Sequence, residues 1–192
     1  GYSYVCQTLD MGIAYYRLVY ARLTGEPFVV AETKNLLIRE MTTKDLPELY
    51  AVYSTLEDCR YIEQLYDYDK ELEFTKNYIK NMYGFFEYGL WLVFEKKSGE
   101  LIGRAGIENR EIDGVTCCEI GYLIRRDMQH KGYAYEACQA ILEYASDELG
   151  IQEMFAVIDK TNEPSRKLAQ KLGFELYAQT DGGPDLYKFV FG

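Results

Sequence analysis

The sequence predicts an α+β fold in which helices cover the faces of a mostly antiparallel sheet. Apolar residues recur at helical spacing in several segments, while other segments have the apolar and aromatic composition of strands. The connections in the middle of the chain are too short for parallel crossovers, which favours antiparallel pairing there. A chain of 192 residues fits one domain that buries a sizeable core.

The first part of the chain is predicted to be mainly helical, with one short strand at residues 35–40 (NLLIRE). In the first helix, apolar side chains recur every three or four residues, and Gly25 and Pro27 then stop it. The second helix begins at a threonine, a residue type whose hydroxyl caps helix N-termini. The predicted helices span residues 8–24, 42 or 43 to about 53, and 69–82.

The middle of the chain changes to a strand pattern and predicts an antiparallel meander. Residues 96–100 (KKSGE) and the pair Asp113-Gly114 are turn signals, because glycine readily adopts the backbone conformations of tight hairpins. These turns separate segments that are rich in apolar residues. The predicted strands are residues 90–94 (LWLVF), 101–107 (LIGRAGI) and 116–124 (TCCEIGYLI).

The last part of the chain alternates between helices and strands. Residues 132–149 carry one apolar face and end at Gly150, and residues 162–172 form a helix that Gly173 closes. The remaining predicted strands are residues 154–158, 174–177 and 186–191.

Composition excludes several classes of protein. A formal net charge of −10 gives no general attraction to nucleic acid or to an anionic membrane. No apolar run reaches the roughly 18 residues that span a bilayer, and residues 1–10 lack the features of a signal peptide. We therefore expect no nucleic-acid or membrane partner and a cytoplasmic location. Five cysteines without a CxxC pair, and a single histidine, predict reduced thiols and no metal site.

Residues 122–134 (YLIRRDMQHKGYA) contain the clearest binding signal. A strand ends there, a short basic segment turns, and Gly132 opens a long helix. The first main-chain N–H groups of a helix have no partner within it and lie at the positive end of its dipole, so they attract anions such as a pyrophosphate. Glycine leaves room for the anion to approach. The pattern alone also fits a plain exposed basic turn, and both interpretations stay open.

Two motifs resemble the signatures of the GNAT superfamily of acetyl-CoA-dependent N-acetyltransferases. Residues 129–134 (QHKGYA) match its Q/R-x-x-G-x-G/A pattern, between a strand and a helix as the family requires. Residues 162–174 (NEPSRKLAQKLGF) resemble its second signature, and residues 119–122 (EIGY) are similar to the branch that contains ribosomal-protein-alanine N-acetyltransferases. The resemblance implies a GNAT-like domain with a splayed mixed sheet at residues 34–192. Residues 1–33 are then a helical extension packed on this domain.

The resemblance also implies where acetyl-CoA binds as a co-substrate. In that family, main-chain groups of the splayed strand pair with the pantetheine arm. The N–H groups at the start of the helix hold the pyrophosphate, and the second signature lies beside the thiol. Carried over to this sequence, the cofactor-binding residues are Leu123, Ile124, Gln129, His130, Lys131, Gly132, Tyr133, Ala134, Asn162 and Ser165.

The implied reaction is direct attack of a neutral primary amine on the thioester in a ternary complex, which requires a base for the amine proton. We expect Glu119 to be that base, with Glu108 as the second choice. The alternative is that Glu119 is a solvent-facing carboxylate paired with a basic residue. Many family members carry a tyrosine, as the acid, at the position of Ala169. Without this tyrosine, Ser165 is the catalytic candidate on the thiol side. The alternatives are a water as the acid, or departure of the thiolate without an acid. Nothing in the sequence places Tyr187 on the thiol side.

The acceptor is expected to be a protein N-terminus or a small-molecule amine, and the chain to be a monomer or a homodimer. Two other functions stay open. The absent tyrosine keeps a catalytically silent CoA-binding module as an alternative, and a basic loop on an acidic protein also fits a different phosphate ligand. Thermal stabilisation by CoA compounds but not by ATP separates the last function from the others, and thiol release with amines separates the first two.

Overall fold

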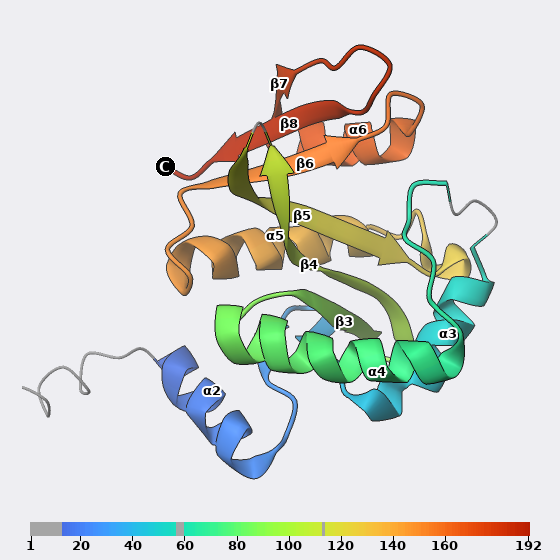
Figure 1. The fold of residues 1–192 in the computed structure, drawn as a ribbon, viewed down its shortest axis with the longest axis vertical. Coiled ribbons are helices and arrows are strands. Elements are labelled where there is room, and N and C mark those ends of the chain that lie inside the picture. Colours follow the sequence, from blue (N-terminus) through green and yellow to red (C-terminus); the bar gives the residue numbers. More distant parts are fainter. Residues whose placement is uncertain (1–12, 57–59, 113) are drawn as a thin grey trace, which may run out of the picture.

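The computed structural model describes residues 13–56, 60–112 and 114–192. These residues form an eight-stranded sheet in the order β1-β2-β3-β4-β5-β6-β8-β7, with helices on both of its faces (Figure 1). Neighbouring strands are antiparallel except β5 and β6, which are parallel. This arrangement confirms the predicted α+β class with a mostly antiparallel, mixed sheet.

The elements have the following bounds. The first part of the chain forms α2 (Ile13–Thr24), β1 (Val29–Glu32), β2 (Leu36–Arg39), α3 (Leu46–Ser54) and α4 (Tyr68–Tyr78). The middle forms β3 (Leu90–Glu95), β4 (Leu101–Ile112) and β5 (Val115–Ile124). The last part forms α5 (Tyr133–Asp147), β6 (Glu153–Ile158), α6 (Glu163–Lys171), β7 (Glu175–Ala178) and β8 (Asp185–Val190). None of the helices in the described ranges is long and apolar enough to cross a membrane.

The structure confirms the predicted helices and strands in their described parts and differs in some details. The sequence does not predict β1, because this short strand shows no clear alternation of buried and exposed residues. The helix predicted at residues 69–82 changes at Ile79 into a π-helical segment that ends at Phe86. β4 continues beyond the predicted end at residue 107, because its polar second half still pairs with β5. Residues 8–12 of the first predicted helix lie outside the described residues.

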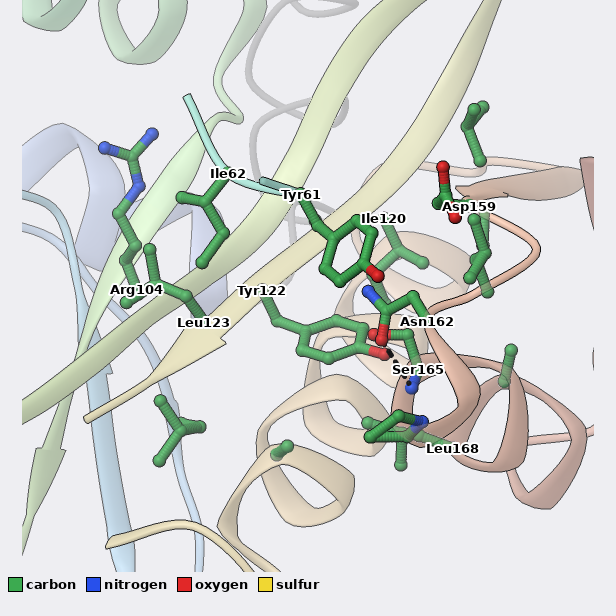
Figure 2. A pocket seen from close by; sticks show the side chains of 18 of the residues that line it. Tyr61, Ile62, Arg104, Ile120, Tyr122, Leu123, Asp159, Asn162, Ser165 and Leu168 are labelled. Carbon is green, nitrogen blue, oxygen red and sulfur yellow. Dashed lines mark hydrogen bonds between the residues drawn. The ribbon is translucent and has the colours of Figure 1, made fainter. Parts of the chain in front are cut away.

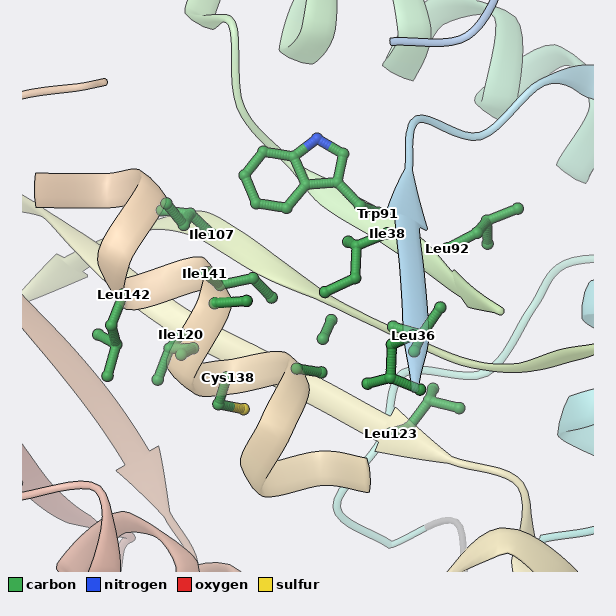
Figure 3. Packing of buried hydrophobic residues seen from close by; sticks show 14 of the residues in the cluster. Leu36, Ile38, Trp91, Leu92, Ile107, Ile120, Leu123, Cys138, Ile141 and Leu142 are labelled. Carbon is green, nitrogen blue, oxygen red and sulfur yellow. The ribbon is translucent and has the colours of Figure 1, made fainter. Parts of the chain in front are cut away.

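Most of the buried core lies between the sheet and α5. Ile120 of β5 packs in the same buried cluster as Cys138 and Ile141 of α5 (Figure 3). Trp91 is fully buried, and its ring meets that of Tyr144 edge-on, with 5.5 Å between ring centroids. Burying a large apolar side chain contributes about 1.5–3 kcal/mol. This layer therefore fixes β5 against α5, which determines where the segment between them lies.

The sheet splays at its parallel pair of strands. The ladder between β5 and β6 contains the pair Glu119–Phe155, and beyond it the two strands diverge (Figure 1). β5 itself stays paired with β4 as far as Ile124, so the separation is between β5 and β6. Main-chain groups of β5 that point toward β6 lose their neighbour at the end of the strand that leads to α5.

The contacts of α2 with the rest of the chain include an ion pair, an apolar cluster and a hydrogen bond of 2.8 Å from Arg22 to the main-chain oxygen of Tyr83. Arg22 donates a hydrogen bond of 2.6 Å to each carboxylate oxygen of Glu40, whose exposed fraction is 4%. The apolar cluster consists of Leu18, Ala21 and Phe28. The division of the chain at residue 33 stays a prediction, and β1, which precedes it, pairs with β2 in the same sheet.

Replacing Arg22 with methionine should lower the free energy of unfolding by about 3 kcal/mol, because the Glu40 carboxylate stays buried without its partner. Chemical denaturation measures this loss. The control is Lys96→Met, which removes an exposed pair with Glu32 and should cost less than about 1 kcal/mol. Equal losses at the two positions would show that the Arg22 pair does not anchor α2.

Candidate active site

A cleft of about 1120 Å³ opens where β5 and β6 separate (Figure 2). It is lined by the C-terminal halves of these strands, the segment that leads into α5, the first turns of α6 and the segment after α3. The structure brings together at this cleft every predicted binding and catalytic residue except Lys131. The amine of Lys131 lies 3.2 Å from the sulfur of Met128 instead.

The main-chain N–H groups at the start of α5 are available to an anion. His130 and Gly132 have positive φ angles of 60° and 87°, and such left-handed residues turn successive N–H groups toward a common side. Within the described residues, no acceptor takes a hydrogen bond from the N–H groups of residues 130–135. A Cβ on Gly132 would meet no atom within 4 Å, so the space beside this backbone is open. The geometry fits a bound pyrophosphate.

Side chains of the same segment fix it against the sheet. Gln129 Nε2 donates a hydrogen bond of 2.9 Å to the main-chain oxygen of Ile124, and the Tyr133 hydroxyl donates one to the carboxylate of Glu95. The side chain of Gln129 and the carbonyl of Ile124 therefore already have partners. What the segment offers a ligand is its main chain, and the roles of Gln129 and Ile124 toward acetyl-CoA stay predictions.

The second motif begins α6 with a side-chain cap. Oδ1 of Asn162 accepts a hydrogen bond of 3.2 Å from the N–H of Ser165, drawn as a dashed line in Figure 2. Pro164 lies in the first turn, where a missing N–H costs nothing because that group would have no partner within the helix. The cap holds Asn162 and Ser165 together where α6 meets the cleft.

Tyr122 of β5 brings a buried hydroxyl to the same place. This hydroxyl forms no hydrogen bond with any described residue, and Figure 2 shows it beside Asn162 and Ser165. Burial raises the pKa of the Tyr122 hydroxyl and outweighs the opposing effect of the neighbouring Ser165, so the group stays protonated and can donate a hydrogen bond. The sequence does not single out this residue. Alternation along β5 places it on the same face as Ile120, but no pattern reveals that its hydroxyl lacks a partner.

The position that holds a tyrosine in many GNAT members is occupied by Ala169, which is buried and lines the cleft. Tyr187 does not replace that tyrosine. Its hydroxyl accepts a hydrogen bond of 3.2 Å from Nε of Arg166, and it is not among the residues that line the cleft.

Two glutamates lie opposite each other on β4 and β5 and line the cleft from the sheet face that carries Leu123. Glu119 accepts a hydrogen bond of 2.6 Å from Nε of Arg110, so it has the basic partner of the alternative interpretation. Glu108 forms no hydrogen bond with a described residue. Burial raises the pKa of its carboxyl group; the Arg104 cation opposes this effect, and the Glu119 carboxylate reinforces it.

The described residues contain no group of three or more side chains placed to hold a metal ion. Cys138 is fully buried and therefore a core residue. Burial also raises the pKa of its thiol. The chemistry that this cleft offers includes main-chain donors, the facing carboxylates of Glu108 and Glu119, and the protonated phenol of Tyr122.

Comparisons with known proteins agree with this geometry. The family described as "Acetyltransferase (GNAT) domain" matches residues 35–175. The uncharacterized protein YkkB of Bacillus subtilis is 33% identical over 134 residues, which are 70% of this chain and 72% of YkkB. The uncharacterized N-acetyltransferase YnaD of the same organism is 33% identical over 143 residues, which are 73% of this chain and 79% of YnaD.

Solved structures show the same fold. The ribosomal L7/L12 α-N-protein acetyltransferase RimL, in complex with coenzyme A, has a TM-score of 0.67 at 15% identity. The likeness covers 84% of this chain and 97% of RimL. The family match extends over most of the chain and includes both signature motifs, at residues 129–134 and 162–174. The chain is therefore an acyltransferase that belongs to the GNAT family of acetyltransferases.

Proposed function

We propose that the protein transfers an acetyl group from acetyl-CoA to a primary amine, which attacks the thioester directly in a ternary complex. The observation that carries this proposal is the row of N–H groups at residues 130–135, from which no described residue accepts a hydrogen bond and which opens onto a cleft of about 1120 Å³. Such a site suits a long ligand with a pyrophosphate. The relative named an N-acetyltransferase and the CoA complex of RimL support the same assignment.

The residues of the cleft fit acetyl-CoA. The N–H groups of residues 130–134 bind the pyrophosphate, and the pantetheine arm follows β5 at Leu123 and Ile124, where β6 has moved away. Asn162 and Ser165 lie beside the thiol. Acetyl-CoA supplies a thioester carbonyl that gains negative charge as the amine attacks, and a main-chain N–H near Ile124 stabilises this charge.

Glu108 is the base that the geometry favours over Glu119. A general base works best when its pKa lies near the operating pH, and burial moves the pKa of Glu108 in that direction. Glu119 is engaged by Arg110 at 2.6 Å, which holds its carboxylate in an ion pair. Glu119 then acts indirectly, because its charge reinforces the raised pKa of Glu108.

Tyr122 replaces the missing tyrosine of α6 on the thiol side. Its protonated hydroxyl forms no hydrogen bond with a described residue and lies beside Ser165, so it can donate a hydrogen bond to the sulfur as the thiolate leaves. A hydrogen bond to a developing charge is stronger than one between neutral groups. Ser165 stays the second candidate for this role.

Replacing Tyr122 with phenylalanine should lower kcat about 10-fold or more, because a hydrogen bond to a charged group contributes about 1.5–3 kcal/mol. Calorimetry supplies an independent readout: the wild type should bind CoA more tightly than desulfo-CoA, and the variant should bind both equally. Tyr177→Phe, on β7 and 61% exposed, is the control and should behave as the wild type. A larger loss in Ser165→Ala than in the Tyr122 variant would assign the role to Ser165.

Two measurements test the function as a whole. Acetyl-CoA and CoA, but not ATP, should raise the unfolding temperature, because a ligand that binds only the folded state stabilises it. Thiol release should then depend on an added amine, with N-terminal peptides and small amines as the two acceptor classes. Stabilisation by CoA without thiol release would favour the silent CoA-binding module, which Ala169 in place of a tyrosine keeps as the second candidate.

A further inference from the structure

β4 places at the cleft one arginine, Arg104, with which no described residue pairs. Arg104 lies opposite Leu123 in the β4–β5 pairing, on the sheet face that also carries Glu108. Its side chain lines the cleft beside Ile62 and Leu123 and is only partly accessible (Figure 2). Among the described residues, none forms a hydrogen bond or an ion pair with the Arg104 guanidinium.

The guanidinium of Arg104 offers hydrogen-bond donors that no described residue accepts. A guanidinium has five N–H donors. The small cavity that Arg104 shares with Glu71 and Tyr78 measures about 10 Å³, which is room for one water at most. Arg104 also lines the larger cleft, where its remaining donors are open to water or to a ligand. The protein therefore keeps donors at this position that its own described residues do not use.

The groups around Arg104 keep it charged. Burial lowers the pKa of its guanidinium, but Tyr53, Tyr78 and Glu108 outweigh that effect and raise the pKa above its ordinary value. Tyr53 and Glu108 also line the cleft. A charged guanidinium with free donors in a partly closed cleft is suited to bind an anionic group of a ligand.

Arg104 lies on the acceptor side of the proposed reaction. It shares its sheet face with Glu108, whereas Tyr122 and the proposed thiol site belong to the other face. Glu108 follows Arg104 four positions later in the strand, which puts their Cα atoms about 13 Å apart. The two side chains therefore contact different parts of one acceptor: Glu108 its amine, and Arg104 a group several bonds away.

We propose that Arg104 selects acceptors that carry a carboxylate in addition to the amine that is acetylated. The inference rests on the proposed function and names the substrate class of the same site. A planar guanidinium binds a carboxylate through two parallel hydrogen bonds, a geometry that lysine cannot reproduce. The carboxylate belongs either to a free amino acid or to an acidic side chain near the N-terminus of a peptide, and the chemistry of recognition is the same.

The test uses matched pairs of amines with and without the carboxylate. γ-Aminobutyrate is compared with its methyl ester, and a short peptide with aspartate at its second position is compared with the asparagine peptide. Calorimetry on the protein loaded with CoA measures binding, and thiol release from acetyl-CoA measures transfer. In at least one pair, the carboxylated member should bind about 10-fold or more tightly than its neutral partner, and the responding pair identifies the source of the carboxylate.

Arg104→Met is the decisive variant, because methionine keeps an unbranched apolar stem and removes the charged guanidinium. It should abolish the preference within the responding pair while leaving binding of the neutral member unchanged. Its unfolding temperature should stay close to that of the wild type, because no described residue forms a hydrogen bond or an ion pair with the guanidinium that is removed. Arg104→Lys should lose most of the preference. Lys167→Gln removes an equally positive, 73% exposed side chain outside the cleft and should keep the preference.

The outcomes separate the inference from the proposed function. Equal binding of both members in every pair, or an equal loss for both members in Arg104→Met, overturns the role of Arg104 even if acetyl transfer occurs. A marked fall in unfolding temperature in Arg104→Met overturns it as well, because Arg104 is then a structural residue. Preferential binding that Arg104→Met abolishes, without any thiol release, supports carboxylate recognition and overturns the acetyl transfer.

Discussion

Replacing Glu108 with glutamine is expected to lower kcat about 100-fold or more at neutral pH, which is within the range typical for loss of a positioned general base. Glutamine keeps the shape of the side chain but cannot accept the amine proton. Thiol release at saturating acetyl-CoA measures the effect. Glu119→Gln is the matched control on the opposite strand, and it should lose less activity because Glu119 is paired with Arg110.

The pH profile gives this prediction a second readout. The base acts only when it is ionised, so activity should fall as the pH drops through the raised pKa of Glu108. The Glu119 carboxylate contributes to that raised pKa, so Glu119→Gln should move the acidic limb of the profile to lower pH. A profile that loses its acidic limb in Glu119→Gln, but keeps it in Glu108→Gln, would identify Glu119 as the base.

Stability should change in the opposite direction from activity. Because the pKa of Glu108 is higher in the folded than in the unfolded state, the contribution of this group to stability is present below its unfolded pKa. That contribution is lost as the pH rises through the folded pKa. Glu108→Gln should therefore unfold at the same or a higher temperature than the wild type at pH 7. This advantage should disappear below the ordinary glutamate pKa of about 4.3.

Replacing Gly132 with alanine is expected to raise the Kd of acetyl-CoA about 10- to 100-fold. The positive φ of 87° disfavours any residue with a Cβ, so the backbone would shift and the N–H groups of residues 130–134 would lose their common direction. The Cβ would also occupy the open space beside these groups. Loss of one or more hydrogen bonds to a charged phosphate accounts for a change of this size.

Gly99→Ala is the matched control for this prediction. Gly99 has a similar φ of 75°, equally open surroundings and a position in the turn between β3 and β4, outside the cleft. Both variants should lose about 1 kcal/mol of unfolding free energy from the strained backbone. Only Gly132→Ala should weaken acetyl-CoA binding. Equal Kd values for the two variants would place the pyrophosphate elsewhere.

Much of the fold could be predicted because local signals and tertiary structure agree. The turn signals around the meander give three neighbouring antiparallel strands, and the helix that opens at Gly132 has a strong apolar face. β1 could not be predicted, because a strand of four partly exposed residues depends on its pairing with β2. The π-helical segment after α4 likewise has no local signal in its sequence.

The site divides in a similar way. Its main-chain anion site follows from a motif, since a glycine at a helix start is visible in the sequence. The sequence does not reveal which side chains of the site are paired, because their partners come from other strands. Glu119 and Glu108 look alike in the sequence, and the position of Arg110 decides which of them is paired. The missing partners of Tyr122 and Arg104 are likewise properties of the folded chain.

The single rung between β5 and β6 has a consequence for how the molecule holds together. This rung divides the sheet into two halves, one made of strands β1, β2, β3, β4 and β5 and the other of β6, β8 and β7. Between the halves, the main chains are otherwise unpaired, and we call this gap the seam. Side chains of one buried cluster, which includes Met154 and Ala156 of β6 and Cys138 of α5, join the two halves. A pantetheine arm with its two amides, lying in the seam, would restore the cross-links that the missing rungs do not provide. Part of the rigidity of this enzyme would then come from its own substrate, and amide hydrogen exchange should slow in β5 and β6 together when the seam is filled.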